Sequence, residues 1–296
     1  EIIFASSLFT NGASTITLGS AALPTILATS GAGSLTITGP GASSLIISGN
    51  NGSDVRNFNI FNIATGGNLT ISGVTISGAK TTSNGAGFSN LGILAVANSL
   101  ITGNTAAGKM GGGIFSSGTL SVSGSTFTSN SAKYGGGLYI SSSGTGTVSN
   151  STFSGNISFA QGGGLFNNGI LTITNSTVSG NTAETNYNFG VGIHSNGTVY
   201  IANTIIANST NGVDYYGTNP NLISPATKYS NLVTQSGLAW ATTVTTAQLN
   251  LGALQNNGGA TSTMALGAGS LAIGAGNSSI SNASPISGLD QRGYSR

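Results

Sequence analysis

A repeat of about 26 residues runs through the middle of this sequence and restricts the folds that the chain can adopt. Each copy begins with a glycine cluster followed by an aliphatic residue, and it ends with an apolar residue three places before an asparagine. A fixed period in this range is typical of a solenoid, in which similar units stack and each contacts only its neighbours. The clusters begin at Gly111, Gly135 and Gly162, and the copies end at Asn104, Asn130, Asn156 and Asn181, which lie 26, 26 and 25 residues apart.

Within each copy, apolar residues alternate with Ser, Thr or Asn, as in Leu94 and Val96 or Leu120 and Val122. Alternation with a period of two places one face of a β-strand inward and the other toward water. Three short strands per copy, joined by Gly and Asn turns, make one coil, and successive coils pair in parallel about 4.8 Å apart. Because parallel crossovers are right-handed, the pattern predicts an all-β fold: a right-handed parallel β-helix, a three-faced solenoid with an irregular C-terminal cap.

The four asparagines that end the repeats are predicted to stack at one turn as an inward-facing asparagine ladder. A buried amide is costly unless it is paired, and a ladder pairs all its interior members at once. The two end members lack one neighbour, so they need a cap or another subunit. An outward ladder of Thr126, Thr152 and Thr177 is expected beside it.

The regularity of the repeat divides the chain into four parts. Residues 1–52 form less regular coils or a cap, and residues 53–210 form the regular β-helix repeats. Residues 211–260 are an irregular insertion that gathers rare aromatic residues, and residues 261–296 are the C-terminal cap. Irregular ends are expected because an uncapped solenoid exposes unpaired backbone groups.

Composition argues against several classes of protein. Only 4% of the residues are charged, and the seven basic residues are scattered, so the sequence carries no footprint for nucleic acid. There is no cysteine for a disulfide or a thiolate metal site, and no apolar run approaches a transmembrane segment. The chain begins at Glu1, without a methionine or a signal peptide, which we interpret as a processed product.

The glycine clusters and repeat endings resemble the repeats of chlamydial polymorphic outer membrane proteins and related bacterial surface β-helices. Near the C-terminus, residues 251–259 (LGALQNNGG), 271–276 (LAIGAG) and 290–293 (DQRG) resemble the choice-of-anchor Q domain family. One position departs from that family's pattern, because Gly274 stands where the motif carries an aspartate. Together the resemblances cover most of residues 60–296, and they imply a secreted, surface-attached bacterial protein with a repetitive ectodomain.

Parallel β-helices include polysaccharide lyases and hydrolases, so a catalytic site is an alternative to weigh. Glycoside hydrolysis needs two carboxylates at a defined separation, and calcium-dependent lyases need several acidic residues. The acidic residues of this chain lie in different segments, and the last of them is expected to pair with Arg292. We therefore expect no catalytic residue, no cofactor and no metal site. The acidic residues are Glu1, Asp54, Glu184, Asp214 and Asp290.

His194 is the only histidine, which argues against a histidine-rich metal site. It follows a glycine-rich stretch and is expected to lie on the outside of a coil. The glycine runs themselves form no phosphate-binding loop, because no G-x-x-x-x-G-K-[ST] pattern occurs. We interpret these glycines as residues that allow tight turns and close packing of coils.

A non-enzymatic structural protein is the favoured function, and the first version of it is a self-assembling surface filament. Subunits would join head to tail by β-helix stacking or strand addition, and a surface with few charges offers little repulsion. The candidate assembly strand is Ile2, Ile3 and Phe4, because it is apolar, terminal and without a repeat partner.

The second version is a monomeric cell-surface adhesin or stalk that binds a glycan or a host surface. Five residues are candidates for a platform that stacks on sugar rings, although the favoured interpretation is that they seal one face or end of the solenoid. Both versions place the protein outside the cell, associated with a cell surface. The platform candidates are Asp214, Tyr215, Tyr216, Tyr229 and Trp240.

Overall fold

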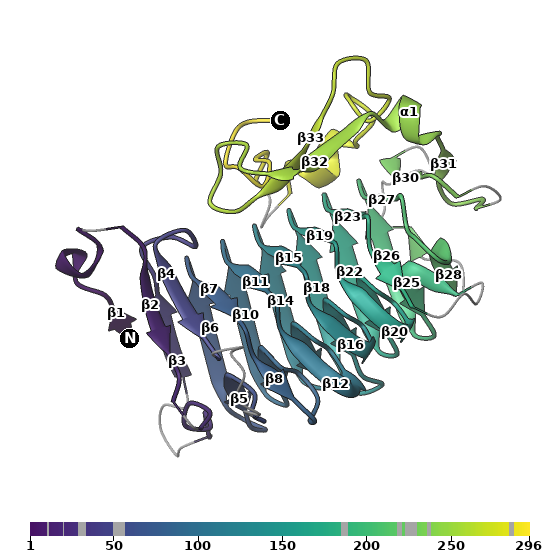
Figure 1. Ribbon diagram of the computed structural model, residues 1–296. Helices are drawn as coiled ribbons and strands as arrows, with labels where there is room; N and C mark the ends of the chain where they lie inside the picture. The colour runs from purple at the N-terminus through teal and green to yellow at the C-terminus, as the bar shows by residue number, and fades with distance from the viewer. Residues whose placement is uncertain are drawn as a thin grey trace.

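The strands stack into a rod, and a C-terminal segment lies along one side of it (Figure 1). The structure is a computed structural model, and in the ranges it describes the strands form four parallel sheets and one antiparallel pair. We name the parallel sheets I to IV in the order in which one coil passes through them. This arrangement confirms the predicted parallel β-helix. The described residues are 1–10, 12–19, 21–28, 34–49, 57–184, 189–217, 221–222, 230–235, 238–283 and 287–296.

Sheets I and II run the whole length of the rod. Sheet I contains β1 (Ile2–Ile3), β3 (Ser34–Thr38), β6 (Asn68–Ser72), β10 (Ile93–Ala97), β14 (Thr119–Ser123), β18 (Thr145–Ser149), β22 (Ile170–Thr174), β26 (Thr198–Ala202) and β29 (Asn221–Leu222). Sheet II contains β2 (Ser14–Thr17), β4 (Leu45–Ser48), β7 (Thr75–Ser77), β11 (Leu100–Thr102), β15 (Thr126–Thr128), β19 (Thr152–Ser154), β23 (Thr177–Ser179), β27 (Ile205–Ala207), β30 (Leu232–Val233) and β31 (Thr242–Thr243).

Sheets III and IV belong to the more regular coils. Sheet III contains β8 (Lys80–Thr81), β12 (Thr105–Met110), β16 (Ser131–Tyr134), β20 (Ile157–Gln161) and β24 (Thr182–Ala183). Sheet IV contains β5 (Phe61–Ile63), β9 (Phe88–Asn90), β13 (Ile114–Ser116), β17 (Leu138–Ile140), β21 (Leu165–Asn167), β25 (Gly190–Ser195) and β28 (Val213–Gly217).

The central coils therefore carry a fourth strand, where the sequence pattern predicts three. The glycine clusters divide the strand of sheet III from that of sheet IV. Gly135 adopts φ +64°, and a side chain there would collide with the carbonyl of Leu138. A Cβ on Gly136 would lie 2.6 Å from the carbonyl oxygen of Gly163 in the next coil. The clusters thus serve both a left-handed turn and the close approach of adjacent coils.

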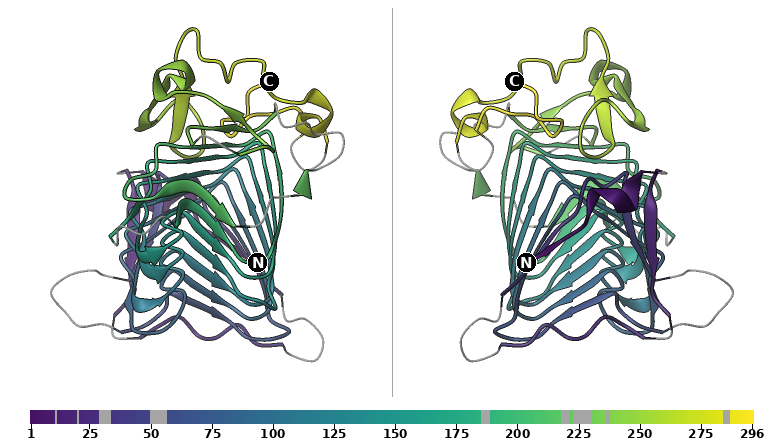
Figure 2. Two further views of the ribbon diagram at one scale, coloured as in Figure 1. Left: turned by 90° about the vertical axis from the view of Figure 1, so that its right-hand side faces the viewer. Right: turned by 90° about the vertical axis from the view of Figure 1, so that its left-hand side faces the viewer.

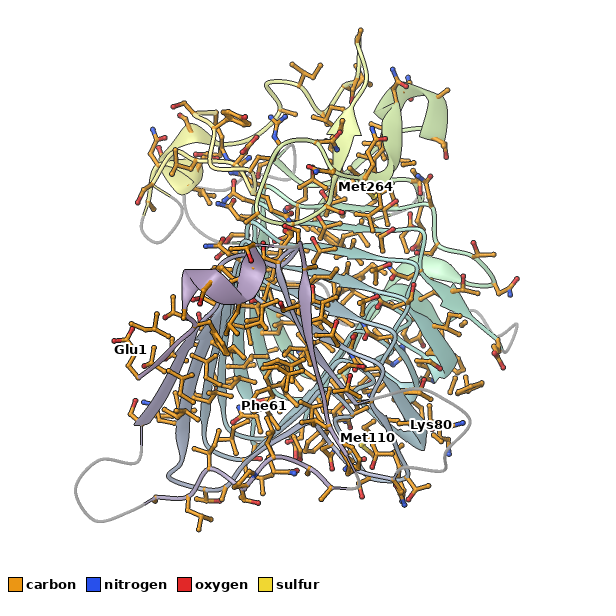
Figure 3. All side chains as sticks on the ribbon, turned by 60° about the vertical axis from the view of Figure 1, so that its left-hand side comes forward. Glu1, Phe61, Lys80, Met110 and Met264 are labelled. Atoms are coloured by element: carbon orange, nitrogen blue, oxygen red, sulfur yellow. The ribbon has the colours of Figure 1, made fainter. Side chains whose placement is uncertain are left out.

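The core is one continuous column of inward side chains stacked in register (Figure 3, where Phe61 is labelled). Phe61 stacks on Phe88 with ring centroids 5.2 Å apart, and Phe127 stacks on Phe153 at 4.4 Å. Burying each such side chain contributes about 1.5–3 kcal/mol. Because each coil adds one layer of this kind, every repeat of the sequence contributes to the stability of the rod.

The asparagine ladder is confirmed, and Asn130 shows its pattern. Its Nδ2 group donates to the carbonyl oxygen of Ile101 at 2.8 Å and to Oδ1 of Asn156 at 2.9 Å. Its Oδ1 atom accepts the backbone N–H and the Nδ2–H of Asn104, at 3.2 and 3.0 Å. The bonds continue from Asn156 to Asn181 in the next coil, and all four amides are fully buried.

A serine ladder that the sequence analysis missed lies at the turn between sheets I and II. Ser125 Oγ donates to the carbonyl oxygen of Ser123 at 2.8 Å and accepts the backbone N–H of Ser99 at 3.2 Å. Ser151 and Ser176 continue the row in the following coils. The signal was an Asn-Ser or Gly-Ser pair that recurs at the repeat period. In each pair the first residue has positive φ: Asn98, Gly124, Asn150 and Asn175.

The last part of the chain lies beside the solenoid as well as at its end. Strands β28 to β31 continue sheets I, II and IV, so part of the predicted 211–260 insertion extends the rod instead of interrupting it. The remainder contains α1 (Thr246–Leu249), the antiparallel pair β32 (Leu251–Gln255) and β33 (Thr263–Leu266), and α2 (Ser278–Ser281). This segment rests on the outward face of sheet II, so residues 261–296 cover a side of the rod (Figures 1 and 2). No helix in the described part of the chain is long and apolar enough to cross a membrane.

Candidate functional site

The outward face of sheet II forms the floor of a cavity in the side of the solenoid. Thr152, Thr177, Ile205 and Leu232 occupy one register position in four consecutive coils, and all four line the cavity. They point outward because their neighbours along the strands, such as Phe153, fill the core. The floor is therefore a straight row of side chains with a spacing of about 4.8 Å.

The C-terminal segment forms the walls and roof of this cavity. Met264 and Leu266 come from β33, Ile273 comes from the loop before α2, and residues 290–292 come from the end of the chain (Figure 3 labels Met264). The cavity has a volume of about 770 Å³. This size lies within the range of about 300–1,000 Å³ that is common for small-molecule sites.

Gln291 fastens the segment to the threonine row at one end of the cavity. Its Nε2 group donates to Thr126 Oγ1 at 3.0 Å and to Thr261 Oγ1 at 2.9 Å, and its Oε1 atom accepts the hydroxyl of Thr152 at 2.7 Å. Thr126 and Thr152 are buried under the segment, whereas Thr177 in the next coil is only half-buried. The cavity thus opens where the segment separates from the row.

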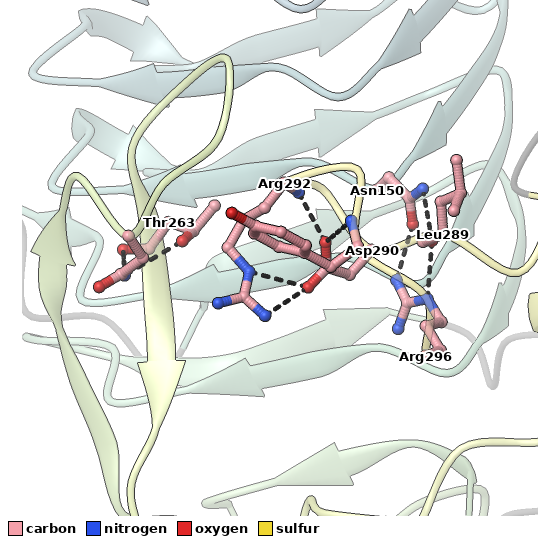
Figure 4. A network of polar contacts seen from close by, with 8 residues as sticks. Asn150, Thr263, Leu289, Asp290, Arg292 and Arg296 are labelled. Carbon is pink, nitrogen blue, oxygen red and sulfur yellow. Dashed lines mark hydrogen bonds and ion pairs between the residues drawn. The ribbon is translucent and has the colours of Figure 1, made fainter.

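Asp290 and Arg292 form the predicted ion pair beside Gln291 (Figure 4). Asp290 Oδ2 accepts hydrogen bonds from Nε and Nη2 of Arg292, at 2.8 and 2.7 Å. Asp290 Oδ1 accepts the backbone N–H groups of Arg292 and Tyr294, at 2.8 and 3.1 Å. The Arg292 guanidinium also lies over the Tyr294 ring, 5.1 Å from its centroid. With both oxygens engaged, this carboxylate shapes the loop and holds the arginine in place.

Three asparagines at the turn between sheets I and II, Asn150, Asn175 and Asn203, hold the rest of the segment. Asn150 Nδ2 donates to the carbonyl oxygen of Leu289 at 3.1 Å (Figure 4). Asn203 donates to the carbonyl oxygen of Asn277 at 3.0 Å and accepts its backbone N–H at 2.7 Å. Asn175 Oδ1 accepts a hydroxyl from α2 at 2.9 Å. The same positive-φ corners that turn each coil therefore also position the cavity wall.

The stacked parallel sheets agree with what a comparison with known families finds. The family described as a right-handed β-helix region matches residues 44–227, more than half of the chain. The chain belongs to the right-handed β-helix family. Comparison of this β-helix with curated proteins and with solved structures finds no match of either kind. The resemblance to the choice-of-anchor Q domains stays a prediction.

The predicted aromatic platform is not available on the surface of this β-helix. Tyr215 is 2% exposed and Trp240 is 5% exposed; their rings meet edge to face at 4.9 Å and close the core at its C-terminal end. Asp214 is buried as well, and of the five candidates only Tyr216 is described as exposed, at 46%. Tyr229 lies outside the described residues. Stacking on a sugar needs free ring faces, so the burial of these residues shows that the predicted platform is wrong. It agrees with the alternative interpretation, in which they seal one end of the solenoid.

A column of stacked rings covers the outside of sheet IV. His194 lies between Phe166 and Tyr216, with ring centroids 4.8 and 5.2 Å apart, and Tyr139 and Phe115 extend the column through the preceding coils. His194 faces outward as predicted, but these rings bury it, and burial lowers the pKa of its imidazole. Among the described residues, no three His, Cys, Asp or Glu side chains come together as a metal site.

The predicted assembly strand already has a partner within its own β-helix. Ile2 and Ile3 form β1, which pairs in parallel with Ile37 and Thr38 of β3. Phe4 is half-buried against the core. The segment is therefore the first strand of sheet I and not a free donor strand. A strand at the end of a parallel sheet can pair through its backbone even though it lacks the glycine cluster of the repeat.

Proposed function

We propose that this β-helix is a non-enzymatic structural protein that acts outside the cell and self-associates through its N-terminal end. The observation that carries the proposal is the apolar, nearly uncharged face at that end. Ile3 is 71% exposed there, and Glu1 is the only charged residue among residues 1–49 of the sequence. Other large apolar residues exposed in the same region are Ile2, Leu8, Ile16 and Leu27.

The edges of the sheets supply the bonding groups for association. β1 is the outermost strand of sheet I, and β2 is the outermost strand of sheet II. Strands at a sheet edge present unpaired N–H and C=O groups, and natural proteins protect such edges with charges, prolines or bulges. Neither β1 nor β2 contains a charged residue or a proline. Pairing with another strand edge would satisfy these groups and cover the exposed isoleucines.

The two ends of the solenoid differ, and the difference favours a pair over a filament. At the C-terminal end, Tyr215 and Trp240 close the core, and Asp214 completes the last turn of the ladder. A second copy that meets the N-terminal face of residues 1–49 through a two-fold axis would bring like faces together, with little repulsion because these residues carry so little charge. We therefore propose pairs joined at their N-terminal ends, in place of the head-to-tail filament expected from the sequence.

Two features support a structural role over catalysis. Asp214 is buried with backbone N–H groups on both oxygens, and Asp290 is paired with Arg292. A catalytic carboxylate needs access to substrate and a second group at a defined distance.

The location outside the cell rests on the resemblance to bacterial surface β-helices and on the sparse charge. A monomeric adhesin or stalk is the competing function.

Light scattering coupled to size-exclusion chromatography, over a concentration series, tests the proposal on the whole chain. We expect a dimer whose population rises with concentration, and short rods of doubled length in negative-stain electron microscopy. Ile3→Lys should convert it to monomer, because it places a charge on each paired edge. Leu271→Lys is the matched control, since Leu271 is 51% exposed on the C-terminal segment. Monomers at every concentration would overturn the proposal, and long filaments would restore the filament model.

A further inference from the structure

The cavity beneath the C-terminal segment has a polar end and an aliphatic end, which correspond to the first and the last coil of its floor. At the polar end, Thr152 donates a hydrogen bond to Gln291 at 2.7 Å. At the other end, Leu232 belongs to a small hydrophobic cluster against which Ile205 and Ala272 pack. The floor spans three coil intervals, or about 14 Å. A ligand that fills it lengthwise must therefore be polar at one end and apolar at the other.

The polar end carries more positive than negative side chains. Arg292 directly follows Gln291, and it lines the cavity together with Arg296 and Asp290. Both oxygens of Asp290 already accept hydrogen bonds, whereas Nη1 of Arg292 has none among the described residues. The ion pair holds the guanidinium in a fixed orientation, so little conformational entropy is lost when it binds an anion. This end therefore offers a hydrogen-bond donor to a carboxylate oxygen.

The walls of the other end are aliphatic. Ile205 and Leu232 of the floor line the same cavity as Met264, Leu266 and Ile273 of the segment. Leu266 is 38% exposed and Ile273 is 60% exposed, so a ligand in the cavity would remove apolar surface from water. None of the described residues that line the cavity is aromatic. Flat rings stack on aromatic side chains, whereas an alkyl chain needs only aliphatic contacts, so these walls suit an alkyl chain.

From these two ends we propose that the cavity binds a medium-chain alkyl carboxylate, such as a fatty acid, with its carboxylate at Arg292 and its chain along Ile205 and Leu232. A small inorganic anion would leave the aliphatic walls in water. A neutral alkyl chain would leave the free donor of Arg292 without an acceptor. The cavity is separate from the N-terminal face, so this proposal does not depend on the pairing of two copies.

Isothermal titration calorimetry of the whole chain with butyrate, hexanoate and octanoate tests the role of the alkyl chain. Each fully buried methylene strengthens binding by about fourfold. We therefore expect octanoate to bind about tenfold more tightly than hexanoate, and butyrate to bind most weakly. Absence of octanoate binding would overturn the proposal, and so would equal affinities across the series.

The position of the ligand is tested by filling the cavity. Thr177→Trp should abolish octanoate binding, because Thr177 lies in the middle of the floor and an indole there would occupy the space of the chain. Ser121→Trp is the matched control, since Ser121 is an exposed, outward residue of β14 on another face. Unchanged octanoate binding in Thr177→Trp would overturn the assignment to this cavity.

Arg292→Gln tests the carboxylate without adding bulk. The substitution removes one positive charge and leaves Asp290 unpaired, so octanoate should bind about tenfold more weakly while the affinity for neutral 1-octanol stays the same. Lys133→Gln is the matched control, because it removes one positive charge from an exposed position of β16 on sheet III. Equal losses of octanoate affinity in the two variants would overturn the placement of the carboxylate at Arg292.

Discussion

Asp214 Oδ1 accepts the backbone N–H of Ser209 at 3.0 Å, and this bond ends the asparagine ladder. Ser209 holds the ladder position in the coil after Asn181, where a serine cannot continue the row of amides. Within the ladder, Asn130 Oδ1 accepts the backbone N–H of Asn104 in the same way, at 3.2 Å. An aspartate therefore provides the cap that the sequence analysis required at one end of the ladder.

This role predicts that Asp214→Asn lowers the free energy of unfolding of the solenoid. Asp214 Oδ2 also accepts the backbone N–H of Thr234 at 3.0 Å. An asparagine would turn an amide NH₂ toward one of these donors, which costs about 1–3 kcal/mol. Urea denaturation monitored by circular dichroism measures the loss. An unchanged midpoint would show that the cap is dispensable.

Removal of an interior rung should be more damaging. Asn130→Ala leaves Ile101 O and both N–H groups of Asn104 without partners in a dry core. We expect the free energy of unfolding to fall by about 3–5 kcal/mol. The control is Ser121→Ala on the exposed face of β14, which should change it by less than about 0.5 kcal/mol. Similar values for the two variants would contradict the energetic role of the ladder.

The burial of His194 predicts that the stability of the fold depends on pH. The effect can be assigned to one side chain, because His194 is the sole histidine. Burial lowers its pKa below the ordinary value of 6.5, so the unfolded chain takes up a proton that the folded chain resists. Stability should be constant above about pH 7.5 and fall as the pH drops through 6.5, by up to about 1.4 kcal/mol per pH unit.

The matched variant is His194→Phe, which keeps a ring between Phe166 and Tyr216 and removes the titration. Its free energy of unfolding should stay level between pH 7.5 and 5.5, where the parent declines. The replacement removes one hydrogen bond, between His194 Nε2 and Oδ1 of the exposed Asn196 at 3.3 Å, while His194 Nδ1 forms none in the described structure. Parallel pH curves for the two proteins would contradict the buried neutral imidazole.

Gln291→Ala should loosen the C-terminal segment while the solenoid stays folded. The substitution removes the hydrogen bonds to Thr126, Thr152 and Thr261 that hold the segment on the threonine row. Limited proteolysis should then cleave within residues 246–296 several times faster, with little change in the thermal midpoint of the rod. Gln255→Ala is the control, because the side chain of Gln255 is exposed and donates only to Asn257, two residues further on. Equal cleavage rates would show that other contacts secure the segment.

Several parts of the fold could be predicted because a solenoid repeats one environment. An asparagine that recurs at the coil period must meet its own kind above and below, so Asn104 to Asn181 fall into a ladder whatever else the chain does. The threonine row follows from the same register. The serine ladder was equally periodic, and it was missed because Ser is too common in this sequence for its spacing to stand out.

The candidate site could not be predicted in this way, because its residues come from segments without a period. Thr152 and Gln291 are hydrogen-bonded although 139 positions separate them. The composition of residues 211–260 revealed their aromatic side chains but not their direction, and Tyr215 and Trp240 turned out to seal the core. In a single sequence, an aromatic residue outside a repeat gives the same signal whether it is buried or exposed.

The sequence by itself determined the coil: its length, its inward and outward faces, its glycine turns and its asparagine ladder. These follow from local alternation and from a constant period, which bring each residue into contact with its counterpart in the next coil. Only the tertiary structure decided where the C-terminal segment lies, which end of the core is closed and where a cavity remains. Those outcomes depend on contacts between parts of the chain that share no repeat, so no spacing in the sequence encodes them.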